Sequence, residues 1–155
     1  MSVRLAIVGD VHLHFNEKDV SYFNASNYDL VVFVGDMVNY APWRAKPIWA
    51  LIQRLQKTTL FMPGNHDCTN VFQLIAEVIG SQPLANISGR KQDHHYKSLT
   101  QALGNASICG YSVHQFDIRE FKFDVISGRP FSMGGPSLSF KPYLRKAYGI
   151  ATLQE

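Results

Sequence analysis

Three short stretches of the sequence carry side chains that can bind metals or move protons. They are residues 9–12 (GDVH), 35–39 (GDMVN) and 64–67 (GNHD), and each follows a run of mainly apolar residues. A single Gly-Asp pair after a strand is common turn chemistry, and Asn, His and Asp also cap helices. Three such stretches in succession are hard to explain as turns, so we interpret them as parts of one site.

The apolar runs before these stretches predict the strands that must position them. Residues 4–8, 29–34 and 58–62 are short and rich in Val, Ile, Leu and Phe, the pattern of strands covered on both faces. Helical spacing in residues 42–57, starting at Pro42, predicts a helix between the second and third strands. This order indicates an α/β fold with a mainly parallel sheet flanked by helices. The carboxyl ends of such strands meet at one edge, where ligands bind.

The rest of the chain gives weaker signals. Thr69 is the expected N-cap of a helix that runs through Ile79 and stops at Gly80. We then expect a polar loop over residues 81–96 and a short helix over 98–103. The later predictions are strands over 106–113 and 121–127, a loop rich in Gly and Pro after the second of these, and a last helix over 142–150.

The ligand types favour a pair of metal ions. Asp10 and His12, two apart on a segment expected to be extended, can reach one ion, and Asp36 can bridge it to a second. Asn65 offers that second ion a neutral oxygen. Carboxylate, imidazole and amide ligands without thiolate suit Mn, Fe, Zn or Ni, and two such ions polarise a phosphoryl group and deprotonate a bridging water. His66 then acts as the general acid or as a donor to the developing charge.

The three stretches resemble the first three signature blocks of the calcineurin-like metallophosphoesterases, in the same order and each after a strand. The resemblance covers residues 4–70, and residues 125–135 (VISGRPFSMGG) further resemble a cyanobacterial and plastid branch. It implies the N-terminal part of a four-layer αββα fold and a dimetal phosphomonoesterase or phosphodiesterase. By this resemblance, Asp10 and His12 bind the first metal and Asp36 bridges the two metals. Asn65 then binds the second metal, and His66 is the catalytic histidine.

The sequence departs from the family pattern in two places. Asn39 stands where many relatives carry an Asp that orients the catalytic histidine, and Asn accepts a hydrogen bond without stabilising an imidazolium by charge. The family also has a later histidine at a strand end and a Gly-His-X-His block, neither of which is present. The later histidines of this chain are His94, His95 and His114. Histidines that are merely exposed or packed are commoner than histidines that bind a metal, so these three are not expected to complete the site. His14 either contacts substrate or faces solvent.

We expect residues 1–155 to form a single, apparently truncated, metallophosphoesterase domain, because relatives would be about halfway through their domain at Glu155. The second metal ion would then have only Asp36 and Asn65 as ligands. We therefore expect at most one weakly bound ion and very low activity. The alternatives to a phosphoesterase are a non-catalytic metal-binding or self-associating fragment and a simple metal- or anion-binding module.

Composition limits the partners. The net charge is +3, and the basic stretches 89–97 and 141–146 lack the pattern of a nucleic-acid arm, so no specific nucleic-acid binding is expected. No apolar run is long enough to span a membrane, and the apolar run near the N-terminus, Leu5 to Val8, is too short for a secretory signal. We expect a cytoplasmic protein, or a plastid one if its source is a plant.

Open strand edges predict a homo-oligomer, with residues 106–113 or 121–127 at the contact. Cys68 and Cys109 form neither a zinc knuckle nor a disulfide framework.

Overall fold

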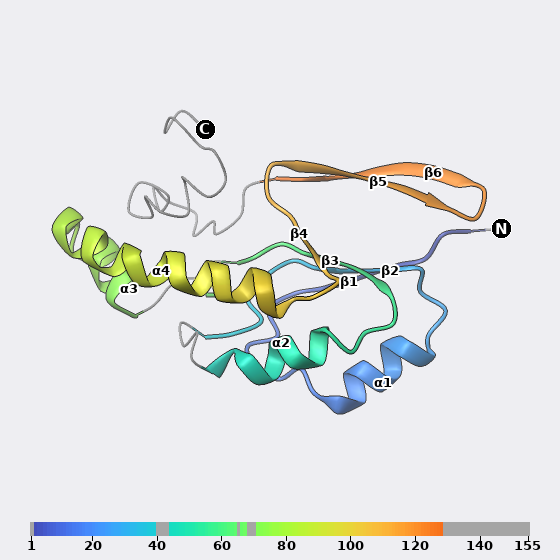
Figure 1. The fold of residues 1–155 in the computed structure, drawn as a ribbon, viewed down its shortest axis with the longest axis horizontal. Helices are drawn as coiled ribbons and strands as arrows, with labels where there is room; N and C mark the ends of the chain where they lie inside the picture. The colour runs from blue at the N-terminus through green and yellow to red at the C-terminus, as the bar shows by residue number, and fades with distance from the viewer. Residues whose placement is uncertain (1, 40–43, 65, 68–70, 129–155) are drawn as a thin grey trace.

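The computed structural model describes residues 2–39, 44–64, 66–67 and 71–128 (Figure 1). Strands and helices alternate through the first half, as the sequence predicts. The elements in chain order are β1 (Leu5–Val8), α1 (Glu17–Ala25), β2 (Leu30–Phe33), α2 (Lys46–Ile52), β3 (Thr58–Phe61), α3 (Val71–Val78), α4 (Gln82–Ala102), β4 (Ser107–Ile108), β5 (Ser112–Ile118) and β6 (Phe121–Ser127).

The main sheet is parallel and has its four strands in the order β1-β2-β3-β4. Val8 pairs with Phe33, Phe33 with Phe61 and Phe61 with Ile108, so the last residues of all four strands are in register. The segments that follow the strands therefore begin at one common edge. The predicted α/β class with a mainly parallel sheet is confirmed, and the first three predicted strands are correct to within one residue at each end.

Alternate residues of the central strands face two different layers. Val31, Phe33 and Phe61 face the helices and are fully buried. The Trp49 ring of α2 meets the Phe61 ring edge-on at 5.4 Å between centroids. Large aromatic side chains contribute most to such a core because each buries a large apolar area. This core fixes the helices α1, α2 and α4 on one face of the sheet.

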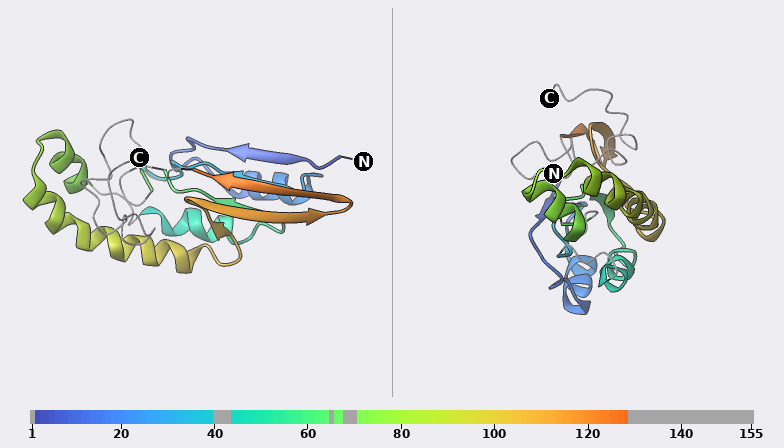
Figure 2. Two further views of the ribbon diagram at one scale, coloured as in Figure 1. Left: turned by 90° about the horizontal axis from the view of Figure 1, so that it is seen from above. Right: turned by 90° about the vertical axis from the view of Figure 1, so that its left-hand side faces the viewer.

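A β-hairpin covers the other face of the sheet. Leu30 and Leu60 are buried there against Phe116 and Phe123 of the antiparallel pair β5–β6, whose rings stack at 5.4 Å. Figure 2 shows this hairpin on the side of the sheet opposite α1 and α2. The described residues thus form three layers, helices, parallel sheet and hairpin. They agree with the expected N-terminal part of a four-layer αββα fold, whose second helical layer is not seen within these ranges.

The predicted loop at residues 81–96 is wrong, because one helix, α4, runs from Gln82 to Ala102. Its start is stabilised by Ser81, whose side chain accepts a hydrogen bond from Leu84 N. The buried stripe of α4 includes the small residues Ala85 and Ser88, which an apolar-periodicity search does not detect. The helix predicted over 98–103 is the last part of α4.

The strand predicted over 106–113 is also wrong. The chain turns at Gly110 (φ +153°) and Tyr111 (φ +46°), which separates the two-residue β4 from the seven-residue β5. Residues in left-handed conformations interrupt a strand, so the apolar run belongs to two sheets. The strand predicted over 121–127 is confirmed as β6.

The helices of the first half differ in part from the predictions. Helix α1 was not predicted, although Asn16 and Asp19 form a capping box at its start. Helix α2 is shorter than residues 42–57, and Pro47 lies in its first turn, while Pro42 is outside the described residues.

Gly80 has φ +67° just after α3, as expected for a helix stop, whereas Thr69 and the predicted helix 142–150 lie outside the described ranges. No helix in the described part of the chain is long and apolar enough to cross a membrane.

Candidate metal centre

The loops after β1 and β2 run side by side and are joined by backbone hydrogen bonds. Asp10 N donates to Gly35 O (3.2 Å) and His12 N donates to Asp36 O (2.9 Å). Asp10, His12 and Asp36 all have left-handed φ values, +53°, +47° and +55°. The expectation that Asp10 and His12 lie on an extended segment is therefore wrong. They lie on a tight turn, and left-handed conformations are those that short polar side chains such as Asp tolerate best.

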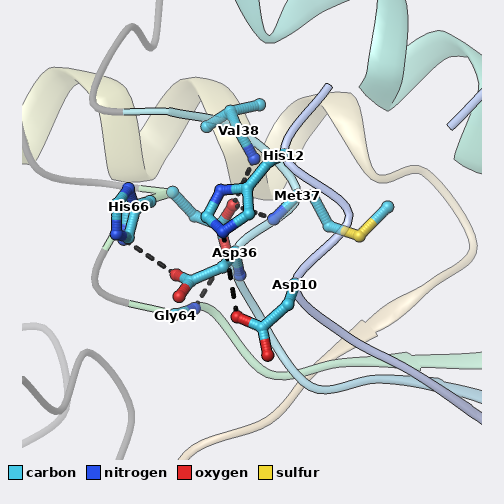
Figure 3. A network of polar contacts seen from close by, with 8 residues as sticks. Asp10, His12, Asp36, Met37, Val38, Gly64 and His66 are labelled. Atoms are coloured by element: carbon cyan, nitrogen blue, oxygen red, sulfur yellow. Dashed lines mark hydrogen bonds and ion pairs between the residues drawn. The ribbon is translucent and has the colours of Figure 1, made fainter. Parts of the chain in front are cut away.

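This geometry brings three potential ligands together. One ligand atom from each of Asp10, His12 and Asp36 lies within 4.8 Å of the other two, and Figure 3 shows the three side chains converging. His12 Nε2 lies 3.9 Å from Asp10 Oδ1. Two carboxylates and an imidazole form the mixed oxygen and nitrogen donor set of a divalent transition metal.

The nitrogen of His12 that faces Asp10 is Nε2, which leaves Nδ1 as the second ring nitrogen. Nδ1 is buried and has no hydrogen-bond partner among the described residues, whereas the second nitrogen of a metal-bound imidazole normally donates to a neighbouring group. The Asp10 side chain, in contrast, is 82% exposed, so an ion can reach the group from solvent.

Two glycines allow the close approach of the second and third loops. A Cβ atom on Gly64 would lie 2.2 Å from Asp36 Oδ1 and 2.6 Å from Asp36 N. A Cβ atom on Gly35, whose φ is +98°, would lie 2.6 Å from the Gly64 backbone. Any side chain at either position would separate the loops. Packing between the loops thus explains the glycines at positions 35 and 64.

His66 lies next to this group. Its backbone N–H donates to Asp36 Oδ1 (3.0 Å), and its ring is 5.0 Å from the His12 ring in an edge-on arrangement. Burial lowers the pKa of His66 below its usual value and the neighbouring His12 lowers it further, while the carboxylates of Asp36 and Asp10 act to raise it. The imidazole is therefore shifted toward its neutral form, which donates a hydrogen bond through one nitrogen.

Asp67 has a role that the sequence did not predict. Its carboxylate is almost completely buried and accepts four backbone hydrogen bonds, from the N–H groups of Asp36, Met37, Val38 and Gly64. Burial raises its pKa to about 7, and so does the neighbouring Asp36 carboxylate, while the bonds from Gly64, Val38 and Met37 act in the opposite direction. Its position in the GNHD stretch was the only signal, and it pointed to capping of the following helix. Three of the four bonds instead go back to the loop after β2.

The roles of the other site residues predicted from the sequence stay predictions. Asn65 lies outside the described residues. Asn39 and His14 are exposed on the loops after β2 and β1, and their roles remain predictions. His94 is exposed on α4, and His114 lies on β5 with Nε2 2.9 Å from Ser112 Oγ. Within the described ranges, neither belongs to the group of metal-ligand atoms.

Comparison with known proteins identifies the family. Residues 3–140 match the model of the calcineurin-like phosphoesterase family. A search of curated proteins found no match. Because the family match covers most of the chain, the protein belongs to the calcineurin-like phosphoesterases, and the resemblance seen in the three loop stretches is confirmed.

Proposed function

We propose that this chain is a dimetal-dependent phosphoester hydrolase acting on small-molecule phosphomonoesters or phosphodiesters. The observation that carries the proposal is the convergence of Asp10, His12 and Asp36, with ligand atoms within 4.8 Å of one another, in a member of this family. In this proposal Asp10 and His12 hold the first ion, Asp36 is shared between two ions, and Asn65 holds the second.

The residues around the proposed ions have separate tasks. Bound Mn, Fe, Zn or Ni ions would polarise a phosphoryl group and make water acidic enough to attack phosphorus. His66 is then placed to stabilise charge on the phosphoryl or leaving-group oxygen. Since the pKa of His66 is lowered, chiefly by burial, hydrogen-bond donation from the neutral ring is favoured over proton transfer from an imidazolium.

Two exposed residues have supporting roles in this proposal. Asn39, three positions after Asp36, orients the His66 ring by accepting a hydrogen bond. His14, two positions after His12, contacts the substrate. Both are exposed beside the ligand loops, which supports access to a bound substrate without fixing either contact.

A second candidate function is metal binding without turnover. It is favoured by one observation: within the described residues, a single group of three carboxylate or imidazole ligands comes together. Under this alternative one ion binds weakly, with waters completing its shell.

The remaining proposals concern location and assembly. We propose that the protein works in the cytoplasm, or in a plastid if its source is a plant, and forms homo-oligomers through the β5–β6 hairpin. Val113 and Ile126, paired across the two strands, are 56% and 77% exposed and support such a contact. Sedimentation at tens of micromolar tests the assembly, and a single monomeric species would contradict it.

One experiment separates the two candidate functions. Hydrolysis of an aryl phosphate monoester and of a bis-aryl phosphodiester is measured with added Mn²⁺, together with the bound metal per chain. The dimetal hydrolase predicts turnover and two ions. Binding of one ion with no turnover of either substrate supports the second candidate, and absence of bound metal contradicts both.

A further inference from the structure

We propose that Asp67 is a positioning residue of the metal centre, whose buried carboxylate holds the loop after β2 in the conformation that presents Asp36 to Asp10 and His12. The inference rests on the proposed metal site. The four hydrogen bonds that Asp67 accepts come from backbone N–H groups, that of Asp36 among them, so Asp67 would act through the backbone of Asp36.

The two carboxylate oxygens of Asp67 accept hydrogen bonds from both loops. Oδ1 accepts from Met37 N (2.9 Å) and Val38 N (3.1 Å), and Oδ2 accepts from Asp36 N (2.9 Å) and Gly64 N (2.8 Å). Successive N–H groups that point to one place form a cradle for an anion. In this fold Asp67 supplies the anion from within the chain.

The loop that these bonds hold has an unfavourable backbone conformation. Gly35 has φ +98° and Asp36 has φ +55°, and a left-handed conformation is unfavourable for a residue other than glycine. The bond from Asp36 N to Asp67 is made in this conformation. Without an acceptor, that N–H would be left without its bond in a partly buried position, at a further cost to the loop.

The same loop also holds His12 and His66. Asp36 O accepts from His12 N at 2.9 Å, and Asp36 Oδ1 accepts from His66 N at 3.0 Å. Figure 3 shows these groups around Asp36. A shift of the Asp36 backbone would therefore move a second metal ligand and the proposed charge-stabilising histidine together.

Asp67→Asn tests the proposal with almost no change in side-chain size. The amide nitrogen cannot accept a hydrogen bond, so two of the four N–H groups lose their acceptor whichever way the amide turns. We expect the dissociation constant for Mn²⁺, measured by calorimetry, to rise about 10- to 100-fold, the usual effect of removing a partner that orients metal ligands. Asp124→Asn, the same exchange at an exposed position of β6, should leave it unchanged.

A control variant tests whether a loss of stability alone lowers the Mn²⁺ affinity. Ile52→Ala, in the buried core of α2, provides a variant with a lowered melting temperature and, by our account, wild-type Mn²⁺ affinity. If Asp67→Asn does not fold, Asp67→Glu is used, because it keeps the charge and both acceptors but moves them by one methylene. That variant should fold and bind Mn²⁺ more weakly than the wild type.

The outcomes distinguish this inference from the proposed function. If the wild type binds no Mn²⁺, or if Asp10→Asn binds it as well as the wild type does, the metal site itself is wrong. If the wild type binds and Asp10→Asn does not, unchanged affinity in a folded Asp67 variant overturns the positioning role. Equal losses of affinity in the Asp67 and Ile52 variants at equal melting temperature overturn it as well.

Discussion

The backbone N–H of Asp36 donates a 2.9 Å hydrogen bond to the Asp67 carboxylate, and the Asp36 carboxylate accepts a 3.0 Å bond from His66, the residue before Asp67. The two acidic residues thus join the loops after β2 and β3 in both directions. Asp36, the proposed bridging ligand, and His66, the proposed charge-stabilising histidine, consequently belong to one hydrogen-bonded network.

Asp10→Asn should remove metal binding without unfolding the protein. The amide keeps the size of the side chain and tolerates the left-handed φ of +53°, and the side chain is 82% exposed, so stability should change by less than about 0.5 kcal/mol. The negative charge that attracts the ion is lost. Calorimetric titration with Mn²⁺ checks the binding, and an unaltered isotherm would argue against Asp10 as a ligand.

Gly64→Ala should damage both stability and metal binding. Its Cβ would lie 2.2 Å from Asp36 Oδ1, so the loops must separate at a cost of about 1–3 kcal/mol. Gly128→Ala is the matched control, since a Cβ there meets nothing within 4 Å. Thermal denaturation and Mn²⁺ titration of both variants provide the comparison, and equal behaviour of the two would show that the close approach of Gly64 to Asp36 is not needed.

His66→Ala should lower the rate of Mn²⁺-dependent phosphoester hydrolysis by about 10²- to 10³-fold, the usual cost of removing a positioned hydrogen-bond donor to developing charge. Metal stoichiometry should stay at the wild-type value, because the backbone N–H of residue 66 still donates to Asp36. Rates and bound metal are measured on the same preparations. Loss of metal in parallel with the rate would make His66 a ligand instead.

Phe33→Ala should destabilise the fold by about 3–5 kcal/mol, because the fully buried ring joins β2 to the helical layer and leaves a cavity when removed. Ile7→Ala, in the neighbouring strand, should cost less than about 0.5 kcal/mol, since that side chain is 71% exposed. Urea denaturation checks both values. A large loss in the Ile7 variant would indicate that another surface covers β1.

The central strands could be predicted because their residues are apolar on both faces. Val31 and Val32 illustrate this, one facing the helices and the other the hairpin. Helices α1 and α4 were not predictable by apolar spacing, because capping by Asn16 and Ser81 and small buried residues such as Ala85 define them. The break at Gly110 and Tyr111 depends on a tertiary change of sheet that local composition does not encode.

The site was predictable in its residue types but not in its geometry. Asp10, His12 and Asp36 could be grouped because the ends of parallel strands share an edge. Their left-handed backbone was missed, since an alternating pattern suggests extended structure. Asp67 was missed as well, because three of its four bonds reach back about 30 residues along the chain to a loop whose N–H groups have no sequence signature.

The most direct test of the central claim is Mn²⁺-dependent hydrolysis of a bis-aryl phosphodiester by the wild type and by Asp36→Asn, with and without a chelator. Our account predicts turnover that requires the metal, is abolished by the chelator and is lost in the variant, whose bridging carboxylate has become an amide. Turnover that survives the chelator, or that is equal in the two proteins, would contradict a metal centre built on Asp10, His12 and Asp36.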